Sequence, residues 1–596
     1  MGKENREEEA IRGYFDIKTL KRIISLMMPH KKFFIIAVII TVIVSAVDIS
    51  LPIIIKQAVD DFILNMGLDA DSRISGLTSK VFIFLGLLAL YFVLNFTQIF
   101  LLNYGGQKTM GDLRDKVFCH FQNLRMSFFD HNPIGRLVTR NTNDIQALDQ
   151  MFSEVLVYII KDSIILIGVM AVVISYSFTF GMFLVAVFII LLISTMAYNV
   201  LSTSLFRRFR VLIARINAVL SEYIMGMTII QLFNQQKRIK GDFSMLNLTY
   251  YDVWKKLAYV SVVYRPFASL MRSISIAMII WYVGGGVIDD KLTLGELTAF
   301  IVYLDRFFHP IFHMTERVEI IKSAIVSGER VFKLLDTQEF IPQKPDAVHP
   351  AVFKPEIEFR DVCFAYNNDN YVLKNISFMV EEGNRVAVVG RTGSGKTSLI
   401  NLLLRFYEFD HGAVSIGGYD IRELDVGYIR KNISYVMQDV YLFSGTVKDN
   451  IMFGIDPSHA KNLEEICHRM QLDYLISRLP RGLDTPVTER GMSFSSGERQ
   501  LISFARALIS NPSLIVLDEA TSNIDSRTEH LIQLAIEELL RGRTSIIIAH
   551  RLSTIKNSNK ILVMHKGRIV EEGNHSKLIS LDGIYSKLYS LQKIPA

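Results

Sequence analysis

Long apolar stretches in the first half of this 596-residue chain constrain its fold more than any other feature. A segment of about 20 apolar residues can cross the hydrocarbon core of a bilayer, where only a helix satisfies its own backbone hydrogen bonds. We predict six such transmembrane helices, at residues 33–55, 81–102, 155–176, 178–201, 269–288 and 294–313. The predicted fold class is multidomain, with a six-helix transmembrane domain first.

Charged residues between these stretches predict the orientation of the chain. Residues 16–32 mix basic and apolar residues, which predicts an amphipathic helix in the inner interface. The two longest connections are rich in Lys and Arg, whereas the connection after the first stretch is acidic. Because basic loops stay in the cytoplasm, we expect an integral membrane protein of the bacterial inner (plasma) membrane, with both termini cytoplasmic.

The two basic connections keep the apolar spacing of helices, as Leu113, Val117 and Phe121 illustrate. We expect them to continue the spans into the cytoplasm as helical hairpins. The first reverses direction near residues 128–135 and the second near residues 210–226. Solvated linkers are the alternative interpretation.

Composition limits the class of protein further. The chain is too long for one hydrophobic core. Its net charge of +6 is small, so we expect no nucleic-acid partner. The three cysteines are far apart and lack metal-ligand spacing, which is typical of reduced cytosolic thiols. The Glu-rich N-terminus lacks the apolar segment of a signal peptide.

Residues 390–397, Gly-Arg-Thr-Gly-Ser-Gly-Lys-Thr, follow a short apolar strand and match a loop that holds nucleotide phosphates. The glycines let backbone N–H groups converge on a phosphate, Lys396 supplies a positive charge, and Thr397 offers a hydroxyl to Mg²⁺. The helix that follows adds its positive N-terminal dipole. The residues expected to contact ATP here are Gly390, Thr392, Gly393, Ser394, Gly395, Lys396, Thr397 and Ser398.

Two more apolar runs predict buried parallel strands that end in titratable residues. Residues 513–517 lead into Asp518 and Glu519, and residues 544–549 lead into His550. Ligands of open α/β sheets bind at the carboxyl ends of the strands. We therefore expect Asp518 to hold Mg²⁺, Glu519 to orient or deprotonate the attacking water, and His550 to polarise the γ-phosphate. A histidine at a strand end is also common as a purely structural residue.

The order of these motifs resembles the ABC ATPase domain, and the six spans with two inner hairpins resemble the transmembrane domain of ABC exporters. The resemblance covers nearly the whole chain. It implies an α/β P-loop ABC ATPase domain after the membrane domain, with bound ATP and Mg²⁺ and hydrolysis that drives transport. The predicted divisions are residues 1–32 for the cytoplasmic N-terminus and interfacial helix, 33–335 for the transmembrane domain, 336–355 for a linker and 356–596 for the nucleotide-binding domain.

The same resemblance implies roles for three further residues. Tyr366 would stack on adenine, although a tyrosine at a strand end often only packs. Gln438 would sense Mg²⁺ and the attacking water while it touches the membrane domain. Asp525 would cross the interface between two nucleotide-binding domains.

One motif departs from the family pattern. Residues 494–498 read Phe-Ser-Ser-Gly-Glu where the family has Leu-Ser-Gly-Gly-Gln. The resemblance implies that Ser495 and the backbone of Gly497 contact the γ-phosphate on the opposing subunit. Ser496 crowds that backbone, and Glu498 adds a negative charge near an anion. This asymmetry favours a heterodimer with a different half-transporter, and a homodimer is the alternative.

The sequence does not name the substrate. The resemblance implies a small amphipathic molecule, such as a drug, lipid or peptide, that leaves the cytoplasm or the inner leaflet by alternating access. An ATP-gated channel or regulator and a homodimeric lipid flippase are the alternatives. Inside the spans, Arg272, Asp305 and His309 are candidate cavity residues. Asp305 could instead pair with Arg272 or Arg306 for structure alone.

Overall fold

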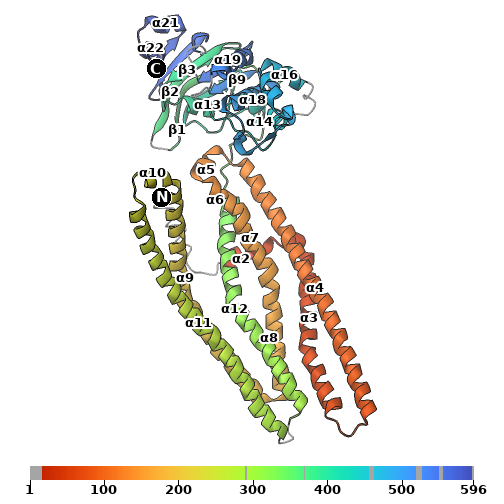
Figure 1. The fold of residues 1–596 in the computed structure, drawn as a ribbon. Coiled ribbons are helices and arrows are strands. Elements are labelled where there is room, and N and C mark those ends of the chain that lie inside the picture. Colours follow the sequence, from red (N-terminus) through yellow and green to blue (C-terminus); the bar gives the residue numbers. More distant parts are fainter. Residues whose placement is uncertain are drawn as a thin grey trace. The chain divides into compact units, whose positions relative to one another are not determined.

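Long helices build the first of the two units into which the chain divides (Figure 1). The computed structural model describes residues 17–288, 292–367, 370–455, 462–518, 526–548 and 555–593. The helical unit comprises Met1–Gln122 and Ile134–Thr337, and the sheet unit comprises Asn123–Pro133 and Gln338–Ala596. We describe each unit by itself.

The helical unit begins with a short amphipathic helix, α2 (Ile17–Ser25), which buries Thr19 and Ile23. Helices α3 and α8 both pack against α12, and α9 runs along α11. The long helices are α3 (Lys31–Ala58), α4 (Ala70–Asn123), α8 (Leu156–Tyr176), α9 (Phe178–Met225), α11 (Gln236–Ile288) and α12 (Leu294–Leu335).

Among the described residues, five helical segments are long and apolar enough to cross a membrane: Met28–Ile63, Ala70–Asn123, Ile134–Tyr176, Phe178–Met225 and Gln236–Ile288. Helix α12 contains the sixth predicted span, but its first half also carries charged residues such as Asp305 and Arg306. In α4 the most apolar window has no residue buried within the chain, as a helix facing lipid or another subunit requires. The prediction of a helical transmembrane domain is confirmed.

The first inner hairpin turns where predicted, through α5 (Met126–His131) and α6 (Ile134–Thr139). From α6 the chain stays helical into α8, through α7 (Ile145–Gln150) and two wider, π-helical turns.

The second hairpin turns later than predicted. Helix α9 continues to Met225, and α10 (Met227–Leu232) forms the tip. The basic side chains near residue 210 are good helix formers, so the helix ends only at Gly226. Asn234, in a left-handed conformation (φ 51°), then redirects the chain into α11.

The sheet unit is built on a six-stranded sheet in the order β12-β11-β3-β10-β9-β6. The five strands from β11 to β6 are parallel, and β12 is antiparallel at the edge. Ile548 pairs with both Val388 and Asp518, so β9 and β10 end level with one another, and β3 runs two residues further, to Gly390. The strands are β3 (Arg385–Gly390), β6 (Ile433–Val436), β9 (Leu514–Asp518), β10 (Thr544–Ile548), β11 (Lys560–His565) and β12 (Arg568–Gly573).

A four-stranded antiparallel sheet, in the order β2-β1-β4-β5, covers one face of the parallel sheet. Residues 357–359 and 362–364 belong to one strand, β1. Asp361, at φ 47°, lies at an irregularity between them. The strands of this sheet are β1 (Ile357–Ala365), β2 (Tyr371–Val380), β4 (His411–Ile416) and β5 (Tyr419–Asp420), and a separate pair joins β7 (Gly445–Thr446) to β8 (Pro486–Val487).

Successive residues of the central strands enter two different hydrophobic cores. Val386 and Val388 pack with the antiparallel sheet, whereas Ala387 and Val389 pack with the helices of the other face. This alternation explains why the strands read as continuous apolar runs. Besides α5, the described helices of this unit are α13 (Lys396–Leu403), α14 (Val426–Asn432), α15 (Val447–Ile451), α16 (Leu463–Arg469), α17 (Asp473–Arg478), α18 (Ser496–Ile509), α19 (Ser526–Leu540), α21 (His575–Ser580) and α22 (Ile584–Lys593).

Candidate nucleotide site and membrane pocket

The helical unit contains a charged cavity of about 310 Å³ between α3, α4, α8 and α12. Asp305 and His309, two of the predicted cavity residues, line it. Arg272 reaches Asp305 from α11, with 2.5 Å between guanidinium nitrogen and carboxylate oxygen. Of the two partners considered for Asp305, Arg272 is therefore the one the structure supports.

Sequence reasoning named Arg306 only as a possible partner of Asp305, and it missed Asp48, Lys161, Asp162 and Arg317 of this cavity. Arg306 forms an ion pair with Asp48, and Arg317 forms one with Asp162. Lys161 also lines the cavity. Asp48, Lys161 and Asp162 all fall inside predicted spans, so charges within apolar stretches were a signal that could have found them.

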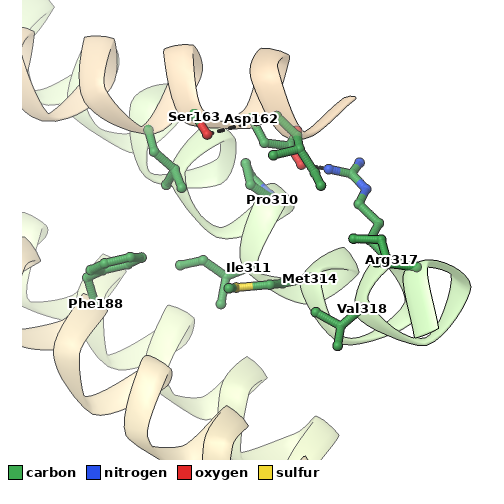
Figure 2. A pocket seen from close by; sticks show the side chains of 11 residues that line it. Asp162, Ser163, Phe188, Pro310, Ile311, Met314, Arg317 and Val318 are labelled. Carbon is green, nitrogen blue, oxygen red and sulfur yellow. Dashed lines mark hydrogen bonds and ion pairs between the residues drawn. The ribbon is translucent and has the colours of Figure 1, made fainter. Parts of the chain in front are cut away.

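A second cavity, of about 210 Å³, adjoins the first and is mainly apolar. It shares Asp162, Pro310 and Arg317 with the charged cavity. Figure 2 shows Phe188, on α9, and Ile311, on α12, among the side chains around it, with the Asp162–Arg317 pair at its edge.

In the sheet unit, the predicted phosphate loop joins β3 to α13. Gly393 and Gly395 have φ angles of 80° and 104°, which favour glycine. A Cβ on Gly390 would lie 2.4 Å from the carbonyl oxygen of Met564. Glycine is thus required for the chain to turn this tightly at the start of the helix.

Lys396 is buried and donates from Nζ to the carbonyl oxygens of Gly390 (2.8 Å) and Arg391 (3.2 Å). Burial lowers its pKa, and the charge of Asp518 opposes this shift. Burial raises the pKa of Asp518, while Lys396 and a hydrogen bond from Tyr435 lower it. A divalent cation beside Asp518 would favour its charged form, so the residues present fit a magnesium site.

The rest of the loop also fits a polyphosphate. The Oγ atom of Ser394 is buried and has no hydrogen-bond partner among the described residues. Thr392 and Thr397 are exposed near the start of α13, and Ser398 is buried behind them. An anion at this helix N-terminus would meet free backbone N–H groups and the positive end of the helix dipole.

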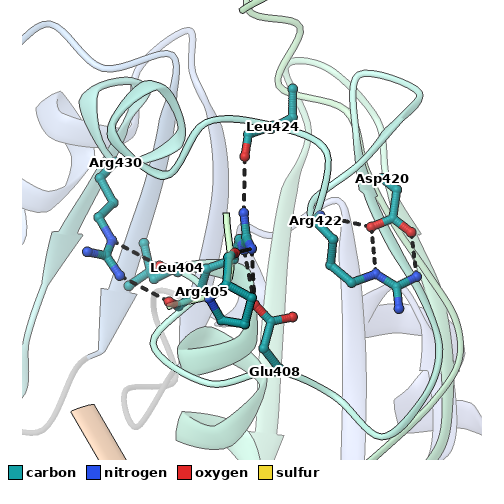
Figure 3. Close-up of polar contacts among 8 residues, drawn as sticks. Leu404, Arg405, Glu408, Asp420, Arg422, Leu424 and Arg430 are labelled. Atoms are coloured by element: carbon teal, nitrogen blue, oxygen red, sulfur yellow. Dashed lines mark hydrogen bonds and ion pairs between the residues drawn. The ribbon is translucent and has the colours of Figure 1, made fainter. Parts of the chain in front are cut away.

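The far end of α13 is fixed by two arginines (Figure 3). Arg405, only 2% exposed, donates to the carbonyl oxygens of Pro342 (2.6 Å) and Leu424 (3.0 Å). Arg430 donates to those of Leu404 (3.1 Å) and Arg405 (3.0 Å). The bonds of Arg430 satisfy carbonyls just past the end of α13, which a helix end leaves free, and the bonds of Arg405 tie this end of the helix to the segments at Pro342 and Leu424.

Tyr366 lies beside the start of α13. Its hydroxyl donates to Ser398 Oγ (3.1 Å) and accepts from the side chain of Asn401 (3.1 Å). Its ring meets Tyr407 edge to face, with 4.9 Å between ring centroids, and the residue is 41% exposed. The ring is therefore held in place with surface left for a stacking partner.

Gln438 is exposed two residues after β6, which neighbours β9 in the parallel sheet. Gln438 and Asp518 therefore lie at the same edge of the sheet, at the carboxyl ends of two neighbouring parallel strands. The structure describes β9 as far as Asp518 and β10 as far as Ile548. The predicted residues Glu519, Asp525 and His550 lie outside the described residues.

Ser495 caps α18, the helix of the unusual signature. Its Oγ accepts a hydrogen bond from the N–H of Glu498 (3.3 Å), and the Glu498 carboxylate accepts one from the N–H of Ser495 (2.8 Å). Gly497 is buried in the first turn. This reciprocal capping box, which sequence reasoning missed, was readable from the Ser-x-x-Glu spacing. The carboxylate of Glu498 therefore already occupies one backbone N–H donor, that of Ser495, at the N-terminus of α18.

Helix α5 of the first hairpin groups with the sheet unit. The Tyr407 hydroxyl donates to the carboxylate of Asp130, on α5. Burial and this bond raise the pKa of Tyr407. Nearby, Arg125 pairs with Glu339 (3.4 Å). Because Tyr407 also contacts Tyr366, the hairpin tip is connected through two rings to the start of α13.

Known proteins match both units. Residues 34–311 match the model of the ABC transporter transmembrane region, and residues 373–522 match the ABC transporter model. An ABC transporter ATP-binding protein of Streptococcus pneumoniae is 36% identical, over 96% of this chain and 97% of that protein. The ATP-dependent lipid A-core flippase of Syntrophus aciditrophicus is 33% identical, over 96% and 94%.

A solved structure of a bacterial Atm1-family ABC exporter with ATP bound superimposes with a TM-score of 0.77, at 27% identity over 95% of this chain and 99% of that one. The matches thus cover the membrane helices and the nucleotide site together. ATP hydrolysis in the sheet unit is coupled to transport through the membrane, and half-transporters of this kind work as dimers. The chain belongs to the ABC transporter family, as an exporter half-transporter with its membrane region fused to its ATPase domain.

Proposed function

We propose that this chain is one half of a heterodimeric exporter that uses one strong and one degenerate ATP site to move an amphipathic substrate out of the cytoplasm or inner leaflet. The observation that carries this proposal is the contrast between two sites of the same unit. The phosphate loop with Lys396 and Asp518 fits a Mg²⁺-bound nucleotide. The signature helix instead binds its own Glu498.

In the strong site, Lys396 and the backbone of the loop hold the β- and γ-phosphates, and Tyr366 stacks on adenine. Thr397, Asp518 and Gln438 hold Mg²⁺, which when bound supplies positive charge to the phosphate oxygens. Glu519 takes the proton of the attacking water, and His550 keeps Glu519 and the γ-phosphate in place. Asp525 contacts the partner across the ATPase interface.

In the degenerate site, Ser495 and Gly497 of this chain face a nucleotide held by the partner's phosphate loop. Glu498 opposes that phosphate with a negative charge at a helix end that otherwise attracts anions.

The tip of α10 supports the presence of a partner. Ile229, Leu232 and Phe233 there are each more than 60% exposed, and such an apolar tip is suited to dock on another subunit.

Glu498→Gln should raise ATP hydrolysis of the assembled transporter about fivefold. Gln can still close the capping box, so the helix is kept while the charge is lost. A repulsion of about 1 kcal/mol between nearby unit charges in water corresponds to this factor. Glu464→Gln, an exposed first-turn glutamate of α16, is the matched control. Equal turnover in both variants would show that Glu498 does not restrain the site.

Tyr407→Phe should lower the amount of substrate transported per ATP hydrolysed at least threefold, and it should not weaken ATP binding. The change removes the hydroxyl that donates to Asp130 and keeps the ring against Tyr366. A hydrogen bond to a charged group contributes about 1.5–3 kcal/mol. Substrate-stimulated hydrolysis and transport are measured with Tyr419→Phe, an exposed tyrosine of β5, as control. If substrate still stimulates ATP hydrolysis and transport as in the unmodified protein, the bond between Tyr407 and Asp130 has no role in coupling.

The substrate class follows from the membrane half and its relatives. The cavities of the helical unit place charged and apolar walls side by side. A relative at 33% identity is named a lipid A-core flippase. Both support an amphipathic substrate taken from the bilayer, in the inner membrane of a bacterium and with cytoplasmic termini.

Expression of this chain alone tests the heterodimer. We expect the lone chain to show little ATP hydrolysis and to gain it when a second half-transporter from the same genome is co-expressed. Native mass spectrometry of the active species should then show one copy of each chain. A stable dimer of this chain alone, hydrolysing ATP at two equivalent sites, would refute the heterodimer.

A further inference from the structure

We propose that the charged cavity binds the anionic group, a carboxylate or a phosphate, of an amphipathic substrate, and that Lys161 is the cation that contacts it. This inference rests on the proposed function, because it names the chemical class of the exported substrate. It adds a specificity residue that lies outside every motif of the sequence.

The carboxylates in and beside the cavity are already neutralised. Each has its own arginine, in the pairs Asp48–Arg306, Asp162–Arg317 and Asp305–Arg272. Paired charges in a membrane protein are the arrangement that low dielectric favours. These three pairs contribute no net charge to the cavity.

Lys161 is the lysine that remains. It lies on α8, lines the cavity and is partly buried. Its ammonium lies 5.7 Å from the centroid of the Tyr91 ring. Among the described residues it forms no ion pair and no hydrogen bond. A cation over an aromatic face is only partly compensated, so the cavity keeps a positive charge that an anionic ligand would neutralise.

The apolar cavity would hold the alkyl chain of the same ligand. It shares three residues with the charged cavity, and its wall is formed by side chains such as Phe188, Ile311 and Met314 (Figure 2). An alkyl chain placed there would leave water while its head stays near Lys161. Charged head and apolar tail sites in contact select amphiphiles over free anions.

The depth of Lys161 agrees with a lipid-like ligand. It lies five residues after the first residue of α8, or about 8 Å along the helix at 1.5 Å per residue. The predicted span begins at residue 155, so Lys161 lies about halfway into the acyl-chain region of one leaflet, where a charged group needs a partner and where a lipid-like ligand can reach it. On the proposed orientation this is the inner leaflet.

The test is ligand binding to the purified transporter in phosphatidylcholine nanodiscs, without ATP. Radiolabelled tetradecanoate is the anionic probe, and tetradecyltrimethylammonium and tetradecanol are the cationic and neutral probes of equal chain length. Empty nanodiscs correct for partition into lipid. The variants are Lys161→Met, Lys161→Arg and, as matched control, Lys322→Met, which removes an exposed lysine of α12.

We expect tetradecanoate to bind at least tenfold more tightly than either other probe. Lys161→Met should abolish this preference, Lys161→Arg should keep it within about threefold, and Lys322→Met should leave it unchanged. Inorganic phosphate should not displace the probe at equal concentration, because it lacks the chain. Met314→Trp, which fills the apolar cavity, should weaken tetradecanoate more than octanoate.

A tetradecanoate affinity unchanged by Lys161→Met would overturn the proposal, as would equal binding of the cationic probe. Displacement by inorganic phosphate alone would show a free-anion site instead of an amphiphile site. Since binding is measured without ATP, failure here is distinct from failure of the proposed exporter function, which would appear as absent ATP-driven transport while Lys161 still selects the anionic probe.

Discussion

Glu519→Gln is expected to slow ATP turnover by about 10²-fold or more while ATP still binds, the usual scale for loss of a general base. Glutamine keeps the size of the side chain but cannot take a proton from water. Glu519 directly follows Asp518 in the sequence. Asp518 ends a fully buried strand and lies close to Lys396, at the site that fits Mg²⁺. Steady-state hydrolysis and nucleotide binding of the complete transporter measure the two effects separately.

Glu537→Gln is the matched control, because Glu537 is an exposed glutamate of α19 in the same unit. Its turnover should equal that of the unmodified protein. Near-normal hydrolysis in Glu519→Gln would remove Glu519 from the mechanism and leave the base unassigned.

Lys396→Ala should weaken ATP binding at least tenfold. A charge-assisted hydrogen bond contributes about 1.5–3 kcal/mol, and Lys396 already points its ammonium at the carbonyls of the phosphate loop. Burial disfavours the charged form of this lysine, so its removal should not lower the melting temperature of the nucleotide-free protein. Loss of affinity would then reflect loss of the charge and not unfolding.

Lys431→Ala, at an exposed position of α14, serves as the control and should bind ATP normally. The measurement is a titration of the purified transporter with a fluorescent ATP analogue. An unchanged affinity in Lys396→Ala would contradict the assignment of the phosphate loop.

The nucleotide site was predictable because its parts are local in sequence. A short strand, three glycines and Lys396 fix a strand, a turn and a helix within about a dozen residues, and the structure contains that arrangement. The same holds for β9, whose apolar run ends at Asp518. In both cases the local sequence determines the local conformation, and the tertiary structure adds only the pairing of the strands.

Contacts between distant segments were not predictable. The pairs Arg306–Asp48 and Tyr407–Asp130 join residues more than 250 positions apart, and only the tertiary packing within each unit brings them together. The second hairpin turns at the end of the predicted region and just beyond it, because periodicity shows that a helix exists but not where it stops. The signature motif was predicted in part. The sequence showed that Glu498 is unusual, but the hydrogen bond from the Ser495 N–H to its carboxylate was recognised only from the structure of the first turn of α18.

Accumulation of a labelled substrate against its gradient tests the central claim, that ATP hydrolysis by this half-transporter and its partner drives export. Inside-out proteoliposomes carrying the complete dimer are given ATP, Mg²⁺ and tetradecanoate outside. The account predicts an internal concentration several times the external one, and none above it with Glu519→Gln. Uptake that stops at equal concentrations, whether ATP is hydrolysed or only bound, would contradict the account and indicate an ATP-gated channel.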